Sequence, residues 1–426
     1  MPEVTLALIG AGLRGQTYAR HAVATGRARV VAVAEPDPRR RAAAAAEFQI
    51  RPEQTYGHWA ELAASMKLAD AAIIATQDRL HREPAVALAG LGYHILLEKP
   101  MAPTEAEATE IAAAAVRAGV IFAVCHVLRY TPYTRMLKRL LAEGRIGRLV
   151  SVQHLEPVGW WHQAHSFVRG NWRRADESGP MLLTKSCHDI DWLVHVVGAV
   201  PARVSSFGSL THFRAAERPA EAADRCLDCP LETTCPYSAK RLYLDCLADP
   251  ERHFWPLGAV TPEPTEQAVL AALRDGPYGR CVYACDNDVV DHQVVNLEFP
   301  DGATGSFTMS AFTPQEHRQT RLMGTHGYLE GNGTTVRYVD FRTGRTSTFD
   351  LATYGSAGDG SAGDGGPSAA DGHGGGDEGL TEAFLAAVAS GDPGLLSSDA
   401  TESLATHRVV WAAERSRRSG ETVQLS

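Results

Sequence analysis

The sequence of 426 residues contains no apolar run that approaches the roughly 18 residues of a membrane-spanning helix. It also lacks a basic excess, because 41 Lys and Arg stand against 50 Asp and Glu and give a formal net charge of −9. A basic face for nucleic acid or anionic membrane is therefore not expected. The N-terminus passes into an apolar strand pattern without a basic segment or a cleavage site, so no signal peptide is predicted. These absences predict a cytoplasmic protein with neither a membrane nor a nucleic-acid partner.

The chain is long enough for two or three domains with their own cores. It has eight cysteines. In an intracellular enzyme such cysteines are more often reduced thiols or metal ligands than disulfides.

The first apolar run, Val4–Ile9, ends in a glycine-rich turn and continues as a helix pattern. The turn is G-x-G-x-x-G, in which Gly10 makes the bend, Gly12 lets the backbone approach a pyrophosphate and Gly15 lets the helix pack on the strand. Glu35 ends the next apolar run, 20 residues after Gly15, where an acidic side chain binds a ribose hydroxyl. Dinucleotide binding is predicted. The alternative is a glycine turn in an α/β domain that binds no nucleotide.

Strand and helix patterns alternate through residues 1–125, which predicts a Rossmann domain with a parallel sheet. Residues 126–426 are predicted to form an α+β domain with an open, mostly antiparallel sheet. Its expected strands are residues 150–155, 203–213, 289–299, 305–312 and 327–340, and its closing helices are 380–390 and 400–415. A cysteine-rich insertion at 214–288 and a Gly-rich loop at 355–376 interrupt this domain.

Two segments carry groups suited to acid–base chemistry. Lys99 follows the strand pattern at 93–97, at the sheet edge where open α/β folds bind ligands. His188 lies in a helix pattern on one face with Thr184 and Asp191, and Asp191 could orient its ring. The alternatives are a surface lysine and a buried structural histidine. Lys185 and Asp189 are spaced as a surface ion pair.

With these motifs, the sequence resembles the Gfo/Idh/MocA family of NAD(P)-dependent sugar and inositol oxidoreductases. The residues that carry the resemblance are Gly10-x-Gly12-x-x-Gly15, Ala75-Thr76 with His81, Glu98-Lys99-Pro100, Arg129 with Pro132, Gly144 to Gly147, and His188-x-x-Asp191. The resemblance implies a Rossmann domain, followed by a domain whose sheet covers the cofactor and supports a homo-oligomer, a dimer or tetramer. It also implies that Lys99 binds the reacting oxygen and that His188 moves its proton.

The cofactor residues expected on this basis are Gly10, Gly12, Leu13, Arg14, Gly15, Glu35, Thr76, His81, Glu98 and Lys99. Glu35 favours NAD, and the nearby Arg39 and Arg40 leave NADP open. The chain departs from the family at Thr184, where many members carry an Asp, so Lys185 or Asp189 could replace it in the proton relay.

Residues 154–172 are dense in polar and aromatic groups of the kind that bind sugars. The expected substrate residues are Lys99, Arg129, Trp161, His162, His165, Arg169, Trp172, Lys185 and His188. The alternative is a loop whose tryptophans fill a domain interface. The segment from His373 to Asp377 could also close over the site.

Cys226, Cys229 and Cys235 have the spacing of metal ligands, and Cys246, Cys281 or Cys285 could complete a structural Zn²⁺ site. Several free thiols are the alternative.

The sequence thus predicts an NAD(P)-dependent oxidoreductase that transfers a hydride between nicotinamide and a secondary alcohol of a sugar, glycoside or cyclitol. Two alternatives use the same fold. One is a redox-neutral enzyme that cleaves glycosides with NAD, and the other is a non-catalytic sugar or dinucleotide sensor.

Overall fold

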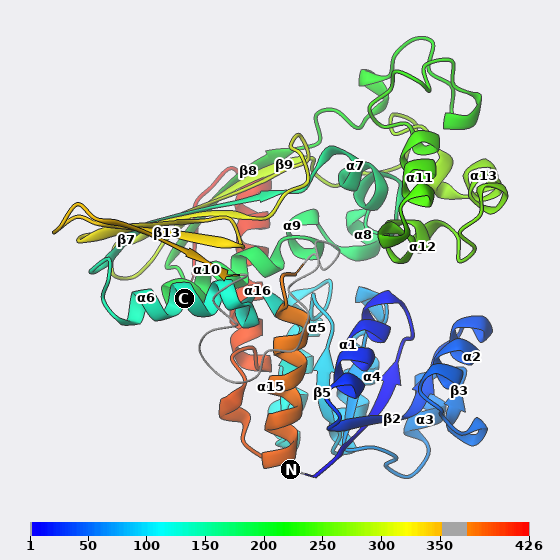
Figure 1. Cartoon of the computed structure of the whole chain (residues 1–426), viewed down its shortest axis with the longest axis horizontal. Helices are drawn as coiled ribbons and strands as arrows, with labels where there is room; N and C mark the ends of the chain where they lie inside the picture. The colour runs from blue at the N-terminus through cyan, green and yellow to red at the C-terminus, as the bar shows by residue number, and fades with distance from the viewer. Residues whose placement is uncertain (1, 352–372, 426) are drawn as a thin grey trace.

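The computed structural model describes residues 2–351 and 373–425, which form two lobes, each built on one β-sheet (Figure 1). The N-terminal sheet has six parallel strands in the order β3-β2-β1-β4-β5-β6. They are β1 Val4–Ile9, β2 Ala28–Ala34, β3 Thr55–Tyr56, β4 Ala71–Ile74, β5 His94–Leu97 and β6 Phe122–Val124. The strand order reverses between β1 and β4, so a ligand crevice is expected at their carboxyl ends. The predicted Rossmann sheet is confirmed.

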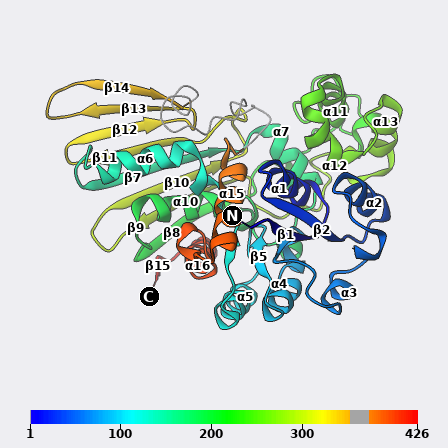
Figure 2. The same ribbon diagram turned by 60° about the horizontal axis from the view of Figure 1, so that its bottom comes forward.

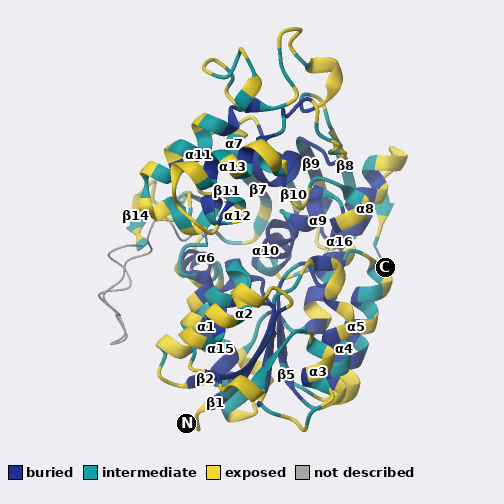
Figure 3. Cartoon of the chain, turned by 90° about the vertical axis from the view of Figure 1, so that its right-hand side faces the viewer, coloured by how far each residue is buried: buried dark blue, intermediate teal, exposed yellow. Residues whose placement is uncertain are grey.

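The helices of this lobe are α1 Leu13–Ala24, α2 Pro38–Glu47, α3 Trp59–Ala63, α4 Arg82–Gly90 and α5 Glu105–Ala118. The strands are buried on both sides, as Figure 3 shows by their dark colour between partly exposed helices. This explains their continuous apolar sequences. Helix α5 begins after Thr104, whose side chain accepts a hydrogen bond from the Glu107 N–H.

The second sheet has nine strands in the order β14-β13-β12-β11-β7-β10-β9-β8-β15. Only β10 and β7 pair in parallel; the other neighbours are antiparallel. The strands are β7 Leu149–Pro157, β8 Arg203–Ser209, β9 His292–Glu298, β10 Thr304–Ser310, β11 Gln319–Gly324, β12 Gly327–Gly331, β13 Thr335–Asp340, β14 Thr346–Asp350 and β15 Val423–Gln424. The mostly antiparallel sheet is thus as predicted.

Details of this sheet differ from the expectation. The single strand expected at 327–340 is a hairpin of β12 and β13, with the turn at residues 332–334. Strands β11 and β14 were not predicted, because their sequences are polar and short and carry little of the apolar pattern that marks a core strand.

One face of the nine-stranded sheet is covered by helices and the other is open (Figure 1). The covering helices are α6 Pro132–Ala142, α10 Cys187–Val197 and α16 Ala400–Ser419. Strand β9 shows the division, since Gln293, Val295 and Leu297 are buried whereas Asn296 is exposed. The alternation read from the sequence therefore reports which side faces the core.

The last two long helices return to the N-terminal lobe. Helix α15, Gly376–Ser390, packs on α1, and α16 packs on both α5 and β8 (Figure 2). Leu380 and Phe384 of α15 join the core that contains Tyr18 of α1. The two lobes are thereby joined by segments far apart in the sequence.

The cysteine-rich insertion, 214–288, projects from the second lobe and has its own small core (Figure 1). Its main helices are α11 Ala239–Ala248 and α13 Glu266–Asp275. Most of the Gly-rich loop expected at 355–376 lies outside the described residues, which resume at His373. In the described ranges, no helix combines the length and apolar character that crossing a membrane requires.

Candidate active site

The glycine turn between β1 and α1 has the form that a dinucleotide requires. Gly10 adopts φ +90°, and a Cβ at Gly15 would lie 2.1 Å from the Gly10 carbonyl oxygen, so the local fold requires both glycines. A Cβ at Gly12, in contrast, would meet nothing within 4 Å. The space beside Gly12 and the N-terminus of α1, which begins at Leu13, is therefore open to an anionic group.

Glu35 stands next to this turn with its carboxylate fixed by the backbone. Its Oε2 accepts a hydrogen bond from the Ala11 N–H at 2.8 Å, and its Oε1 accepts one from the Asp37 N–H at 3.0 Å. Each oxygen keeps acceptor capacity for a ribose hydroxyl. At the neighbouring strand end, the buried Thr76 hydroxyl has no hydrogen-bond partner among the described residues. These groups fit an NAD molecule laid across the carboxyl ends of β1, β2 and β4.

Arg14, in the first turn of α1, links the glycine turn to two other segments. Its Nε donates to Glu98 Oε1 at 2.7 Å, and its Nη2 donates to Asp377 Oδ1 at 2.6 Å. Burial alone would raise the pKa of Asp377, but the charges of His373 and Arg14 hold it well below its usual range. The cofactor turn, the end of β5 and the start of α15 therefore form one ionic network.

His81 fixes the loops that follow β4 and β5. Its Nδ1 lies 2.9 Å from the Pro100 carbonyl oxygen and its Nε2 lies 3.2 Å from the Thr76 carbonyl oxygen. The ring is fully buried. The ring therefore joins the residue after Lys99 to the loop that follows β4.

Lys99 reaches across to the second lobe. Its Nζ donates to the carbonyl oxygen of Thr184 at 2.6 Å. Thr184 ends the short helix α9, Met181–Thr184, and α10 starts at Cys187, so the helix expected through this region is broken at residues 185 and 186. The Thr184 carbonyl, at the end of α9, accepts the hydrogen bond from the lysine.

His188 lies one turn beyond this carbonyl and is 4% exposed. Neither ring nitrogen has a hydrogen-bond partner among the described residues. Burial, the positive charge of Lys99 and the neighbouring His373 hold the pKa of His188 well below its usual range. The imidazole is therefore neutral at physiological pH and can accept a proton.

The expectation that Asp191 orients His188 was wrong. Asp191 forms a bidentate ion pair with Arg129, with both N–O distances 2.7 Å, and also accepts from the Thr406 hydroxyl. Burial would raise the pKa of Asp191, but the Arg129 charge holds it at about 2. Arg129 also pairs with Glu402 and is itself buried, so the structure commits this expected substrate residue to an internal salt bridge.

Lys185 and Asp189 do not form the expected surface ion pair. Lys185 Nζ lies 2.8 Å from Glu156 Oε1, and the fully buried Asp189 pairs with Arg318 and with His154, at 3.1 Å. The helical i, i+4 spacing does not hold between these residues, because the helix is broken at residues 185 and 186. Asp189 therefore pairs with His154 and Arg318 and does not hydrogen-bond to the His188 ring.

Some side chains of the aromatic segment 160–172 lie near the lysines and the interface between the lobes, and others lie in the cysteine-rich insertion. His162 lies near the lysines, and burial together with the charges of Lys185 and Lys99 lowers its pKa well below the usual value. Trp161 packs against Trp255, with ring centroids 5.3 Å apart. Trp172 Nε1 donates to Asp78 Oδ2 at 3.1 Å and so links the two lobes, the alternative role considered for these tryptophans.

His165 and Arg169 point into the insertion instead. His165 Nδ1 lies 2.7 Å from the Tyr243 hydroxyl. Arg169 donates to the carbonyl oxygens of Arg280 and Tyr237, both at 2.7 Å. These two expected substrate residues are buried in contacts that hold the insertion on the second lobe.

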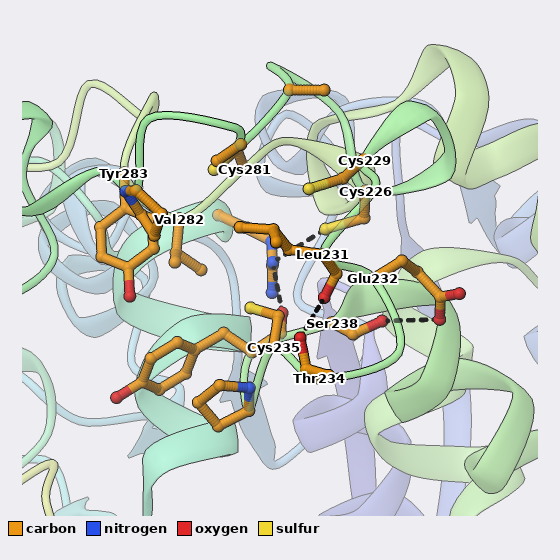
Figure 4. Close-up of a pocket in the computed structure, with 16 residues that line it drawn as sticks. Cys226, Cys229, Leu231, Glu232, Thr234, Cys235, Ser238, Cys281, Val282 and Tyr283 are labelled. Carbon is orange, nitrogen blue, oxygen red and sulfur yellow. Dashed lines mark hydrogen bonds between the residues drawn. The ribbon is translucent and has the colours of Figure 1, made fainter.

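Cys226, Cys229, Cys235 and Cys281 line one cavity of about 230 Å³ (Figure 4). Within the described residues, however, no three His, Cys, Asp or Glu side chains are grouped so that they could hold a metal ion. The Arg169 guanidinium enters the cavity and donates to Cys226 Sγ at 3.5 Å, and the Ala239 N–H approaches the same sulfur at 3.5 Å. The described residues therefore do not bring the cysteines together as the predicted zinc site requires.

Sequence reasoning missed His126, and it singled out His373 and Asp377 only as the ends of a segment that could close over the site. His126 is buried beside His188, with ring centroids 6.1 Å apart. His373 and Asp377 stand where the C-terminal chain returns to the cofactor turn. The only signal for the last two was their place in a Gly-rich stretch, which gave no partner.

The fold and the site define a dinucleotide-binding oxidoreductase with two lobes. Residues 4–126 match the Oxidoreductase family, NAD-binding Rossmann fold, and residues 138–425 match the Oxidoreductase family, C-terminal alpha/beta domain. The chain belongs to the Gfo/Idh/MocA family.

Named relatives match over shorter stretches. The chain is 30% identical over 149 residues to 2,7-anhydro-N-acetylneuraminate hydratase of Escherichia coli K12, covering 35% of this chain and 39% of the relative. It is 36% identical over 135 residues to 1,5-anhydro-D-fructose reductase of Ensifer adhaerens, covering 31% of this chain and 39% of the relative. A structure of levoglucosan dehydrogenase with NADH and levoglucosan has a TM-score of 0.73 at 20% identity over 99% of both chains, which shows a shared fold.

The different demands on Gly15 and Gly12 can be tested by alanine substitution. Gly15→Ala should lower the free energy of unfolding by about 1–3 kcal/mol, because its Cβ meets a backbone oxygen at 2.1 Å. Gly12→Ala should leave the melting temperature nearly unchanged and weaken NADH binding, since its Cβ enters the open space. Thermal unfolding and NADH fluorescence titration measure both effects. Equal melting temperatures for the two variants would contradict the assignment.

The buried histidines predict how stability depends on pH. Burial lowers the pKa of His126 and His165 to about 3 and that of His407 to about 4, whereas the unfolded chain titrates near 6.5. Their stabilising contribution is complete above pH 6.5 and is lost as the pH falls, by about 1.4 kcal/mol per histidine per pH unit. Denaturant unfolding at pH 7.5 and 5.5 should show this loss. An unchanged free energy of unfolding would contradict it.

Proposed function

We propose that the chain catalyses hydride transfer between NAD and a secondary alcohol of a sugar, glycoside or cyclitol. The observation that carries the proposal is the hydrogen bond from Lys99, at the carboxyl edge of the Rossmann sheet, to the Thr184 carbonyl of the second lobe, one helical turn before the buried and unpaired ring of His188. NAD, when held on the glycine turn and Glu35, supplies the hydride acceptor. The protein side chains then bind the sugar hydroxyl and accept its proton.

Lys99 binds the reacting hydroxyl through its ammonium group and stabilises the developing negative charge on the oxygen. The Thr184 carbonyl holds this ammonium in place at 2.6 Å. His188, neutral and otherwise unpaired among the described residues, takes the proton from the same hydroxyl. His162 and Lys185 lie near the Lys99 charge and are proposed to contact the rest of the sugar.

The curated relatives support this substrate class, although the chain matches only 39% of the length of each. Both carry the names of anhydro sugars, and one is a reductase. A structural neighbour is a sugar dehydrogenase bound to NADH. Anhydro sugars are therefore included in the substrate class proposed for this chain.

NAD is proposed over NADP because of Glu35. Its buried carboxylate would lie against a 2′-phosphate and repel it, whereas it accepts a hydrogen bond from a free 2′-hydroxyl. We also propose a cytoplasmic location, in line with the eight free cysteines.

A homo-oligomer is proposed through the open face of the nine-stranded sheet. Phe207 of β8 is 63% exposed and Phe312, just after β10, is 48% exposed. A groove of about 410 Å³ runs beside Phe312 between β9 and β10. Exposed aromatic side chains on an uncovered sheet favour burial against a second copy of the chain.

A redox-neutral reaction is the second candidate, because one curated relative bears the name of a hydratase. The same Lys99 and His188 would then act while the nicotinamide returns to its starting state. Accumulation of NADH separates the two candidates, since only net oxidation produces it.

The proposed function is tested by incubating the chain with NAD⁺ or NADP⁺ and a panel of sugars, anhydro sugars, glycosides and inositols. Absorbance of the reduced nicotinamide should rise with at least one member of the panel, and faster with NAD⁺ than with NADP⁺. Product analysis of the same mixtures would detect a redox-neutral conversion. A chain that converts no member of the panel in either way would refute the proposal and favour a sensor.

Lys99→Ala should lower kcat by about 10²–10⁴-fold, because the developing charge on the oxygen loses its cation. The matched control is Lys67→Ala, which removes a lysine of the same lobe that donates to the Gly92 carbonyl and lies over the Tyr93 ring, away from the proposed site. Steady-state kinetics should show wild-type rates for the control. A Lys99→Ala variant with wild-type kcat would remove Lys99 from the proposed role.

A further inference from the structure

We propose that His373 and Asp377 form the second half of a proton relay that carries the substrate proton from His188 to water. This inference rests on the proposed function. It gives a role in that function to two residues that lie outside the motifs shared with the family. His373 lies against His188, with ring centroids 5.5 Å apart and planes inclined by 56°. Its Nδ1 lies 3.2 Å from Asp377 Oδ2.

Exposure to solvent increases from His188 to His373, which is the direction in which a proton must leave the site. His188 is 4% exposed, whereas the His373 side chain is 23% exposed. A buried base that has accepted a proton cannot release it into water directly and needs a neighbour that can. His373 is the imidazole next to His188 that is in contact with solvent.

The other neighbour of His188 is a poorer acceptor. His126 is 1% exposed and burial lowers its pKa to about 3. Besides burial, the groups that lower the pKa of His188 are Lys99, His373, His126 and Arg318, and the two permanent cations among them, Lys99 and Arg318, disfavour a lasting charge on its ring. A proton on His188 is therefore driven toward a site with a negative partner.

Asp377 supplies that partner. Its carboxylate is 1% exposed and is held ionised by Arg14 and His373. The bond from Nδ1 of His373 to this carboxylate directs the other ring nitrogen, Nε2, to act as the acceptor. A carboxylate behind an imidazole orients the ring and stabilises the cation that forms on it.

The side chains that the sequence suggested for this role are committed elsewhere. Asp189 is paired with Arg318 and His154, Asp191 with Arg129, and Lys185 with Glu156. The position of the family carboxylate holds Thr184, whose hydroxyl contacts only the Pro180 carbonyl at 3.5 Å among the described residues. His373 and Asp377 take the place of this missing carboxylate from a segment about 190 residues later.

The alcohol loses its C–H hydride to NAD⁺ and its O–H proton to His188, and the C–O bond becomes a carbonyl. The proton passes from His188 to His373, directly or through one water molecule, and the His373 imidazolium stays paired with Asp377 until it releases the proton to solvent. The reverse path delivers a proton for reduction.

The relay is tested with His373→Gln, His373→Ala and Asp377→Asn, assayed on a substrate that the wild-type chain oxidises. Each should lower kcat by about ten- to a hundredfold and make kcat depend on buffer concentration, since the proton then leaves through buffer. Added imidazole should restore much of the rate of His373→Ala. NADH titration should give a wild-type Kd for the two His373 variants, which shows that the cofactor site is intact.

The matched control is His326→Gln, an exposed histidine between β11 and β12 in the other sheet, which should behave as wild type in every assay. Wild-type kcat and pH profile for both His373→Gln and Asp377→Asn would overturn the relay and leave the proposed function standing. A loss of rate in His373→Ala with no imidazole rescue and no buffer dependence would also overturn it, since that is a structural effect. A wild-type chain without activity would refute the function and the relay together.

Discussion

One hydrogen bond between the lobes, from the Lys99 ammonium to the Thr184 carbonyl, is the contact on which the arrangement of the site depends. An ammonium group taken out of water needs a fixed acceptor, and here the end of α9 provides one at 2.6 Å. The break after Thr184 then starts α10 with His188 in its first turn. One local feature of the backbone therefore positions both the cation and the base.

The C-terminal chain completes this site by returning to the cofactor turn. Arg14 binds Glu98, directly before Lys99, and Asp377, at the start of α15. Leu380 and Phe384 anchor that helix in the core of the Rossmann lobe. The turn that receives the dinucleotide and the groups proposed to handle the proton are thus parts of one network, so a change at Arg14 is felt at both.

Much of the fold could be predicted because the signals are local. The alternating strand and helix patterns and the glycine turn depend on neighbouring residues, and they predicted the parallel sheet correctly. Partner choice between distant segments could not be predicted. Asp191 pairs with Arg129, Lys185 with Glu156 and Asp377 with Arg14, and in each pair the partners are at least 29 residues apart, so that local sequence patterns do not reveal them. The cysteine spacing likewise could not show that Arg169 enters the thiol cavity.

The most direct test of the account is a crystal structure of the chain with NADH and a sugar that it oxidises. The account predicts one sugar hydroxyl within hydrogen-bond distance of both Lys99 Nζ and a ring nitrogen of His188, with the carbon that bears it facing the nicotinamide. A sugar bound with its hydroxyls out of reach of either group, or a cofactor bound away from the Gly12 turn, would contradict it.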